Sequence, residues 1–265
     1  ARHQIAHAID IQPKEVIFAS MKRILIIVVL LLGGYLAAFG QEFERMVFTA
    51  EDGTELNYRL LRPAETAKAK KFPLIIFLHG LGERGTDNDR QLTWGGNMFL
   101  NPVNMEKYPA YVLFPQCPET AFWAYKDIPA SYDALYAEEQ MPAPFKAVKE
   151  MIDTYLTYPD IDRSRVYIMG LSMGGMATYD MVSRFPEIFA AAIPICGAVE
   201  PSRLTGIEGV SFRIFHGDAD PDVPVRCSRE AYKALKEAGV KVEYIEFPGC
   251  THGSWNPAFC RDDFM

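Results

Sequence analysis

The sequence predicts an α/β fold, in which helices pack on both faces of a mostly parallel β-sheet. From Phe43 onward, short apolar runs rich in β-branched residues alternate with segments whose apolar residues recur every three or four positions. The runs are almost continuously apolar, as is typical of buried parallel strands. With 265 residues, 49% of them hydrophobic and 23% charged, the chain is long enough for one domain with a substantial core.

The expected elements begin with a hairpin. Residues 46–49 and 56–61 are separated by the turn sequence Glu51-Asp52-Gly53 and are interpreted as its two strands. Six further strands are expected at residues 72–78, 110–114, 166–169, 190–195, 212–215 and 242–247. Helices are expected at residues 144–156, 173–185 and 228–237, where the apolar spacing is helical. Residues 123–141 have no clear period, and we expect either a functional surface loop near the top of the sheet or a simple connection.

The first 40 residues are excluded from the folded domain. Residues 1–20 precede Met21 and are interpreted as upstream sequence. Residues 21–40 have the basic start, apolar centre and small-residue end of a signal peptide, with cleavage near Gln41. The alternative is a membrane anchor, because the apolar stretch approaches spanning length. We therefore expect residues 41–265 to form a domain that is secreted or periplasmic, without stable membrane insertion after cleavage.

A serine lies in a glycine-rich turn between the strand expected at residues 166–169 and the helix expected after it. The turn, Gly170-Leu171-Ser172-Met173-Gly174, has the G-x-S-x-G pattern of a nucleophile elbow. Its two glycines avoid the side-chain collisions that such a sharp reversal would cause. A serine hydroxyl is a weak nucleophile unless a base activates it, so the pattern predicts a catalytic Ser172 beside a histidine and a carboxylate.

The base is predicted by elimination. The chain order for this architecture is serine, acid, histidine, and of five histidines only His252 follows both Ser172 and an acidic loop at the end of a strand. Three carboxylates of that loop are candidates for orienting the histidine: Asp218, Asp220 and Asp222. The alternating acids are similar to a calcium loop, but Val223 occupies the position of its sharp-turn glycine, so we expect no metal there.

Two backbone N–H groups are expected to stabilise the negative charge that develops during acyl transfer. One belongs to Met173, directly after the serine, and the other to Leu81 in the sequence His79-Gly80-Leu81-Gly82. His79 itself is interpreted as a structural residue whose hydrogen bonds hold this loop. The predicted chemistry requires no cofactor.

The net charge and the cysteine content give two further indications about function and stability. The net charge is −7 and the domain has no basic cluster, which argues against nucleic-acid binding. Five cysteines allow at most two disulfides, and a bridge between Cys250 and Cys260 would stiffen the loop that contains His252. The alternative is that all five are small, buried or partly buried thiols.

Several motifs together resemble one family. The sequences at residues 79–88, 115–118, 170–175, 216–221 and 251–255 are similar to those of secreted α/β-hydrolase esterases related to feruloyl esterases of carbohydrate esterase family one. The resemblance implies an α/β-hydrolase fold with about eight strands and no large cap domain, and it favours Asp220 as the acid. Such enzymes usually continue into a terminal helix, whereas this sequence ends at Met265. We therefore expect a truncated C-terminus and, through the exposed face, lower stability or association into a homo-oligomer.

The combined prediction is a serine carboxylesterase that hydrolyses short-chain, acetyl or hydroxycinnamoyl esters as small molecules or on plant cell-wall polysaccharide. Three tryptophans near the motifs are candidates for a sugar or aromatic binding platform, with burial in the core as the alternative: Trp94, Trp123 and Trp255. Two other functions remain open, a serine peptidase of the same fold and a noncatalytic carbohydrate-binding relative.

Overall fold

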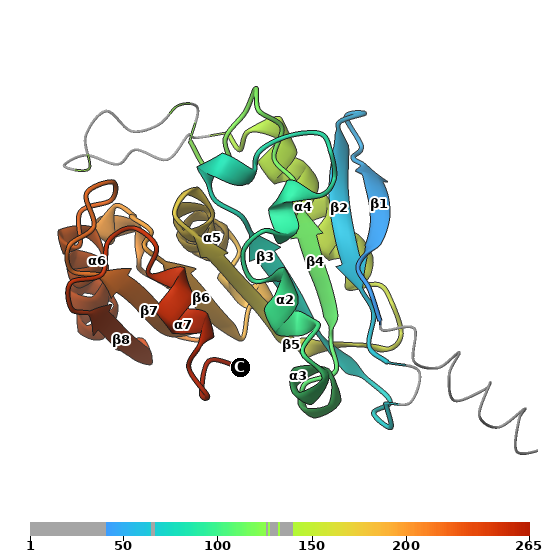
Figure 1. Cartoon of the computed structure of the whole chain (residues 1–265). Coiled ribbons are helices and arrows are strands. Elements are labelled where there is room, and N and C mark those ends of the chain that lie inside the picture. The colour runs from blue at the N-terminus through green and yellow to red at the C-terminus, as the bar shows by residue number, and fades with distance from the viewer. Residues whose placement is uncertain (1–40, 65–66, 126, 128–131, 133–139) are drawn as a thin grey trace, which may run out of the picture. The chain divides into compact units, whose positions relative to one another are not determined.

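The computed structural model describes residues 41–265 apart from residues 65–66, 126, 128–131 and 133–139. Eight strands form one sheet in the order β1-β2-β4-β3-β5-β6-β7-β8 (Figure 1). Their bounds are β1 Glu44–Thr49, β2 Glu55–Leu61, β3 Phe72–Leu78, β4 Tyr111–Pro115, β5 Ile161–Leu171, β6 Ala191–Ile195, β7 Ser211–Gly217 and β8 Val242–Phe247. β1 and β2 pair antiparallel, β2 pairs antiparallel with β4, and the remaining pairs are parallel.

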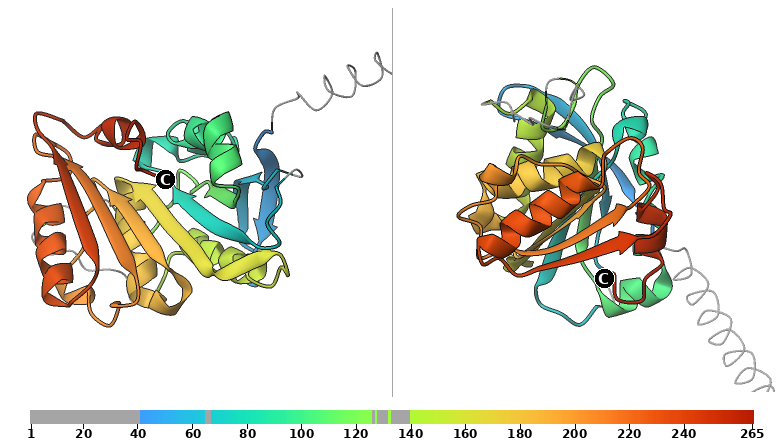
Figure 2. Two further views of the ribbon diagram at one scale, coloured as in Figure 1. Left: turned by 90° about the horizontal axis from the view of Figure 1, so that it is seen from below. Right: turned by 90° about the vertical axis from the view of Figure 1, so that its left-hand side faces the viewer.

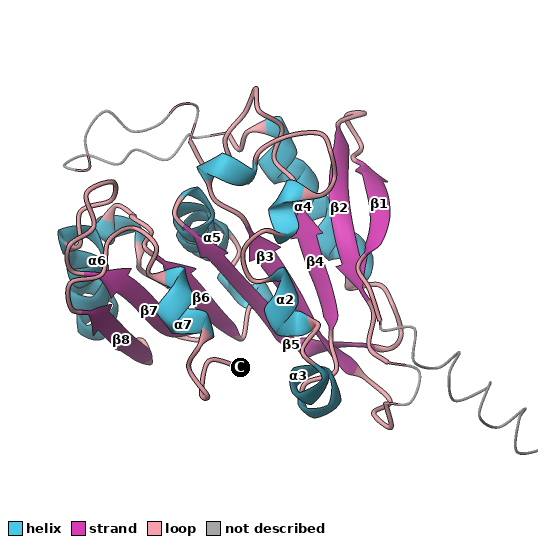
Figure 3. Ribbon diagram, in the orientation of Figure 1, coloured by secondary structure: helices cyan, strands magenta, loops and turns pink. Residues whose placement is uncertain are grey.

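Helices cover both faces of the sheet (Figures 2 and 3). α4 (Ala143–Tyr155), α5 (Met173–Arg184) and α6 (Arg226–Glu237) pack with alternate strand residues such as Ile76 in one apolar cluster. The other face carries α2 (Gly96–Phe99) and α7 (Trp255–Phe259), whose apolar residues cluster with Phe77. α3 (Pro102–Lys107) follows α2. The predicted α/β fold with eight mostly parallel strands and helices on both faces is therefore confirmed.

The C-terminal segment packs on the same face as α7. Phe264 is buried, and its ring lies 5.6 Å from that of Phe215 and 5.2 Å from that of Phe259. The residues after the histidine loop thus cover part of the sheet, although the only helix in them, α7, is five residues long. That short helix has no clear periodicity in the sequence and was not predicted, and neither were α2 and α3.

The element bounds differ from the prediction mainly at β5. This strand begins at Ile161, five residues before the apolar run, and the four residues between them are polar and exposed or only partly buried. All five cysteines lie in the described part of the chain and are free thiols, so of the two alternatives left open by the sequence, the structure has the free thiols and not the Cys250–Cys260 bridge. The predicted upstream sequence and signal peptide, residues 1–40, lie outside the described residues, as does most of the loop predicted at residues 123–141. No helix within the described residues is both long enough and apolar enough to span a membrane.

Candidate active site

Ser172 sits at the tight turn between β5 and α5. Its backbone angles, φ 53° and ψ −117°, are rare for a residue with a side chain, and its N–H donates to the carbonyl of Ile195 at 2.9 Å. The flanking glycines permit this turn sterically. A Cβ atom on Gly170 would lie 2.4 Å from the carbonyl oxygen of Gly174, and one on Gly174 would lie 1.9 Å from that of Leu78. The G-x-S-x-G sequence is therefore what allows β5, β3 and α5 to meet behind an outward-facing serine.

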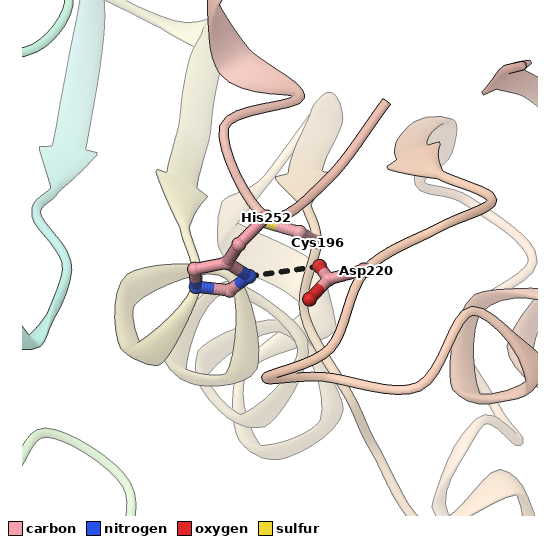
Figure 4. Close-up of side chains that lie close together, drawn as sticks. All are labelled: Cys196, Asp220 and His252. Atoms are coloured by element: carbon pink, nitrogen blue, oxygen red, sulfur yellow. Dashed lines mark hydrogen bonds and ion pairs between the residues drawn. The ribbon is translucent and has the colours of Figure 1, made fainter. Parts of the chain in front are cut away.

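His252 lies in the loop between β8 and α7 and faces this serine. Its Nε2 is 2.8 Å from the Oγ of Ser172. Its Nδ1 is 2.8 Å from Oδ2 of Asp220, the contact that Figure 4 marks with a dashed line. Trp255 packs its ring edge-on against the imidazole with the centroids 5.5 Å apart. With Nδ1–H donating to the carboxylate, Nε2 carries the lone pair that can accept the serine proton.

Asp220 follows β7 and is held by four donors. Its Oδ1 accepts the backbone N–H groups of Asp222 at 2.9 Å and Val223 at 3.0 Å, while its Oδ2 faces His252 at 2.8 Å and the Nε2 of His216 at 3.2 Å. Burial raises the pKa of this carboxyl, but the hydrogen bonds from His216, His252 and Val223 outweigh it, so the net pKa is lowered and the group is ionised.

The other two acids of this loop are placed differently. Asp218 accepts the N–H of Gly249 at 2.6 Å and so ties the β7 loop to the loop that contains His252. Asp222 is exposed and lines the cavity next to Ser172. Of the three carboxylates that the sequence left as candidates, Asp220 is the one in contact with the imidazole.

The carboxylate also changes the basicity of the imidazole. Burial lowers the pKa of His252, but the hydrogen bond to Asp220 and the neighbouring Cys196 thiol outweigh this, and the net pKa is raised. A stronger base accepts a hydroxyl proton more readily, provided that the medium is basic enough to keep the ring neutral.

His216 was not identified from the sequence as part of the site. The ring is fully buried, with Nδ1 2.7 Å from the Oγ of Ser228 and Nε2 2.9 Å from the carbonyl oxygen of Val223. A carbonyl only accepts, so Nε2 carries a proton that also points toward Asp220. The one available signal was that His216 precedes the acidic loop directly, and that position on its own indicates no contact.

The expected oxyanion donors both border the cavity. Met173 provides the first N–H of α5, which has no acceptor within its helix, and Leu81 begins a short 3₁₀ turn after β3. His79 is buried beside them, with Nδ1 donating to the carbonyl of Gly80 at 2.6 Å and Nε2 accepting the N–H of Cys117 at 2.9 Å. Burial lowers the pKa of His79 to about 4, so the ring is neutral and holds the loop, as the structural interpretation expected.

Ser172 and His252 open into a cavity of about 530 Å³. Its aromatic and apolar lining includes Trp94, Phe122, Tyr125, Tyr132, Met176 and Trp255. Three carboxylates also line it: Glu83, Asp127 and Asp222. Trp94 and Trp255 lie side by side, their ring centroids 5.5 Å apart, and Trp94 donates its Nε1–H to Glu83 at 3.1 Å. This volume is within the usual range for small-molecule sites.

Trp123 does not belong to this cavity, which corrects the three-tryptophan platform. Its side chain is fully buried, its ring lies tilted against that of His79 with the centroids 5.2 Å apart, and its Nε1–H donates to the carbonyl oxygen of His79 at 3.2 Å. The sequence placed all three tryptophans near motifs, but proximity along the chain does not determine which side of a loop faces solvent. Trp123 packs behind the loop that carries Leu81 and supports it from the core.

Known proteins resemble this chain in sequence and in fold. Residues 64–260 match the model of the phospholipase/carboxylesterase family. The crystal structure of a thermostable esterase superposes with a TM-score of 0.76 at 37% identity, covering 84% of this chain and 61% of that one. A probable carboxylesterase, SOBER1-like, from Arabidopsis thaliana is 26% identical over 69% of this chain and 73% of its own length. Feruloyl esterase B from Neurospora crassa is 29% identical over 53% of this chain and 44% of its own length.

The matches differ in how much of each relative they cover. The chain spans between 12% and 73% of the length of the first three curated relatives it matches. The expected resemblance to esterases and feruloyl esterases is confirmed, as is the prediction of an ester hydrolase at the level of the family. The family match covers residues 64–260, which include the elbow, the acidic loop and the histidine loop. The chain therefore belongs to the phospholipase/carboxylesterase family.

Proposed function

We propose that this protein is a serine carboxylesterase in which Ser172 is the nucleophile. His252 takes the hydroxyl proton as Ser172 attacks the ester carbonyl, Asp220 holds the imidazole in the required tautomer, and the N–H groups of Leu81 and Met173 receive the negative charge. The alcohol leaves with the proton from His252, and water then releases the acid from the acyl-enzyme. The observation that carries this proposal is the continuous hydrogen-bonded chain from Oγ through the imidazole to the buried carboxylate.

The cavity supports a substrate class. Aromatic side chains, including Trp94 and Trp255, favour flat acyl groups or sugar rings, and the volume accommodates a hydroxycinnamoyl group as well as short acyl chains. The three carboxylates that line the cavity would repel a negatively charged substrate. We therefore propose neutral esters as substrates, with acetyl, short-chain and hydroxycinnamoyl groups, free or on plant cell-wall polysaccharide.

The activity test compares ester and peptide turnover. The protein is expected to hydrolyse p-nitrophenyl esters of increasing acyl length, methyl ferulate and acetylated xylan, and Ser172→Ala is expected to lose this activity by more than about a thousandfold. Labelling by an organophosphonate should require Ser172. Turnover of peptides but not esters would identify a peptidase, and absence of both labelling and turnover would identify a noncatalytic relative.

Two esters that differ only in charge test the proposal that the substrates are neutral. p-Nitrophenyl butyrate and the p-nitrophenyl hemiester of succinic acid have chains of similar length and differ in one carboxylate. The neutral ester should give the higher kcat/KM, and Asp222→Asn should narrow the difference because it removes one of the facing charges. Equal kcat/KM values for the two esters in the unaltered protein would contradict the electrostatic argument.

Export is proposed from the sequence of residues 21–40. A basic start, an apolar centre and small residues before Gln41 support cleavage and release outside the cytoplasm. N-terminal sequencing of the protein from the culture medium or periplasm should give Gln41 or a close neighbour as the first residue. Recovery of the intact chain in the membrane fraction would support the anchor instead.

A further inference from the structure

One cluster at the site has a composition that the proposed reaction does not need. Among the described residues, Cys196, Asp220 and His252 bring a sulfur, a carboxylate oxygen and an imidazole nitrogen within 4.8 Å of one another (Figure 4). Ester hydrolysis uses the carboxylate and the imidazole but has no step for the thiol. Cys196 is fully buried, follows β6 directly and adopts φ 39°, which is uncommon for a residue with a side chain.

From this cluster we propose an inhibitory site for Zn²⁺ or a similar borderline-soft divalent cation, bound by Cys196 Sγ, Asp220 Oδ2 and His252 Nδ1. These are three of the ligand types that zinc prefers, and a fourth position would be left for water. The charges favour the site, because a thiolate, a carboxylate and a neutral imidazole balance one divalent cation and leave no net charge in the interior. Asp220 is held through Oδ1 by two backbone N–H groups, so Oδ2 remains directed at the site.

The geometry requires only small movements. Ligand atoms around a tetrahedral zinc are about 3.3 to 3.5 Å apart, given bond lengths of about 2.0 Å to nitrogen or oxygen and 2.3 Å to sulfur. The Nδ1 to Oδ2 distance is 2.8 Å and would open slightly, while the sulfur would move inward by roughly 1.4 Å at most.

Binding would block the reaction through the tautomer of His252. The metal takes the lone pair of Nδ1, so the proton of the neutral ring moves from Nδ1 to Nε2, and the thiol proton is released to solvent. Nε2 then donates toward the Oγ of Ser172 and can no longer accept its proton. Inhibition therefore rests on the proposed function, whereas metal binding itself does not.

Cobalt titration tests the binding without any assay of activity. One equivalent of Co²⁺ added to the protein should give a thiolate-to-metal charge-transfer band together with the intense visible bands of tetrahedral coordination, and Zn²⁺ should displace them. Cys196→Ala and Cys196→Ser should lose the charge-transfer band. Cys260→Ala, the matched control, should keep it, because Cys260 is the exposed thiol and lies outside the cluster. A band that is absent from the unaltered protein, that survives both Cys196 substitutions or that disappears in Cys260→Ala would overturn the site.

Two further measurements complete the test. X-ray absorption of Zn²⁺ bound to Cys260→Ala should show one sulfur at about 2.3 Å with the remaining ligands at about 2.0 Å, and a shell without sulfur would refute the proposal even if the Cys196 variants fail to fold. In the ester assay, Zn²⁺ inhibition of each variant is measured relative to its own metal-free turnover, and Cys196→Ala should require at least roughly tenfold more Zn²⁺ for half inhibition than the unaltered protein. If the unaltered protein hydrolyses no ester even without metal, the proposed function is contradicted. The cobalt titration then still tests whether the metal site exists.

Discussion

Replacement of His216 would measure how much the positioning of Asp220 contributes to catalysis, because His216 contacts Asp220, but neither Ser172 nor the substrate takes part in that contact. His216→Leu keeps a buried apolar volume but removes the Nε2–H that lies 3.2 Å from Asp220. Asp220 keeps its contact with His252 and both backbone donors, so it should remain ionised and in place. A contact of this length to a charged group contributes about 1 to 2 kcal/mol, which corresponds to a loss in kcat/KM of about 5- to 30-fold.

The same substitution should cost more in stability than in activity. The carbonyl of Val223 and the hydroxyl of Ser228 both lose a buried partner, at about 1 to 3 kcal/mol each, so the free energy of unfolding should fall by roughly 2 to 6 kcal/mol. Ser228→Ala is the matched control, because it leaves the ring and its contact with Asp220 intact. It should lower stability by about half as much and leave kcat/KM almost unchanged.

Urea unfolding and steady-state kinetics on p-nitrophenyl acetate measure the two effects. Asp220→Asn sets the lower limit of activity, since loss of the correct imidazole tautomer costs about 10⁴-fold in kcat. If folded His216→Leu loses as much activity as Asp220→Asn, then the four donors to Asp220 do not act independently. If it loses less than about twofold, the 3.2 Å contact does not orient the acid, and the reasoning from hydrogen-bond distances would be wrong.

Three other predictions test separate parts of the structure. The acid limb of the pH profile of kcat/KM should lie above the ordinary histidine pKa of about 6.5, because the pKa of His252 is raised and the ring must be deprotonated to act. In Asp220→Asn the limb should move to lower pH, because the carboxylate charge that raises the His252 pKa is gone. A limb that does not move would belong to another group. Phe264→Ala should lower the free energy of unfolding by about 3 to 5 kcal/mol, whereas Val103→Ala, at an exposed side chain, should change it by less than about 0.5 kcal/mol. Gly174→Ala should yield little folded protein by circular dichroism, because its Cβ would overlap the backbone of β3; a stable, active variant would show that β3 can move.

The sequence was sufficient for the parts of the site that depend on local backbone chemistry. The turn at Ser172 can be recognised because it needs its glycines: a Cβ atom at Gly170 or Gly174 would lie 2.4 or 1.9 Å from a backbone oxygen, which is too close for any other residue type. His252 could be found because the chain has few histidines. The strands β5, β7 and β8 run in the same direction, so their carboxyl ends, and the loops that follow them, lie on the same side of the sheet. These features are encoded in residue type and order, and a single sequence shows both.

The predictions that were wrong concern side chains whose positions depend on packing between segments that are distant in the sequence. Trp123 and Trp255 both lie in irregular segments beside motifs, yet one is fully buried behind His79 and the other lines the cavity. Nothing in their neighbouring residues distinguishes them, because the difference arises from which face of the sheet each segment returns to. Replacing each with alanine should therefore give opposite results: Trp255→Ala should raise KM for methyl ferulate with little change in stability, and Trp123→Ala should lower the free energy of unfolding by about 3 to 5 kcal/mol. A rise in KM confined to the Trp123 variant would mean that the substrate approaches from the other side of the Leu81 loop.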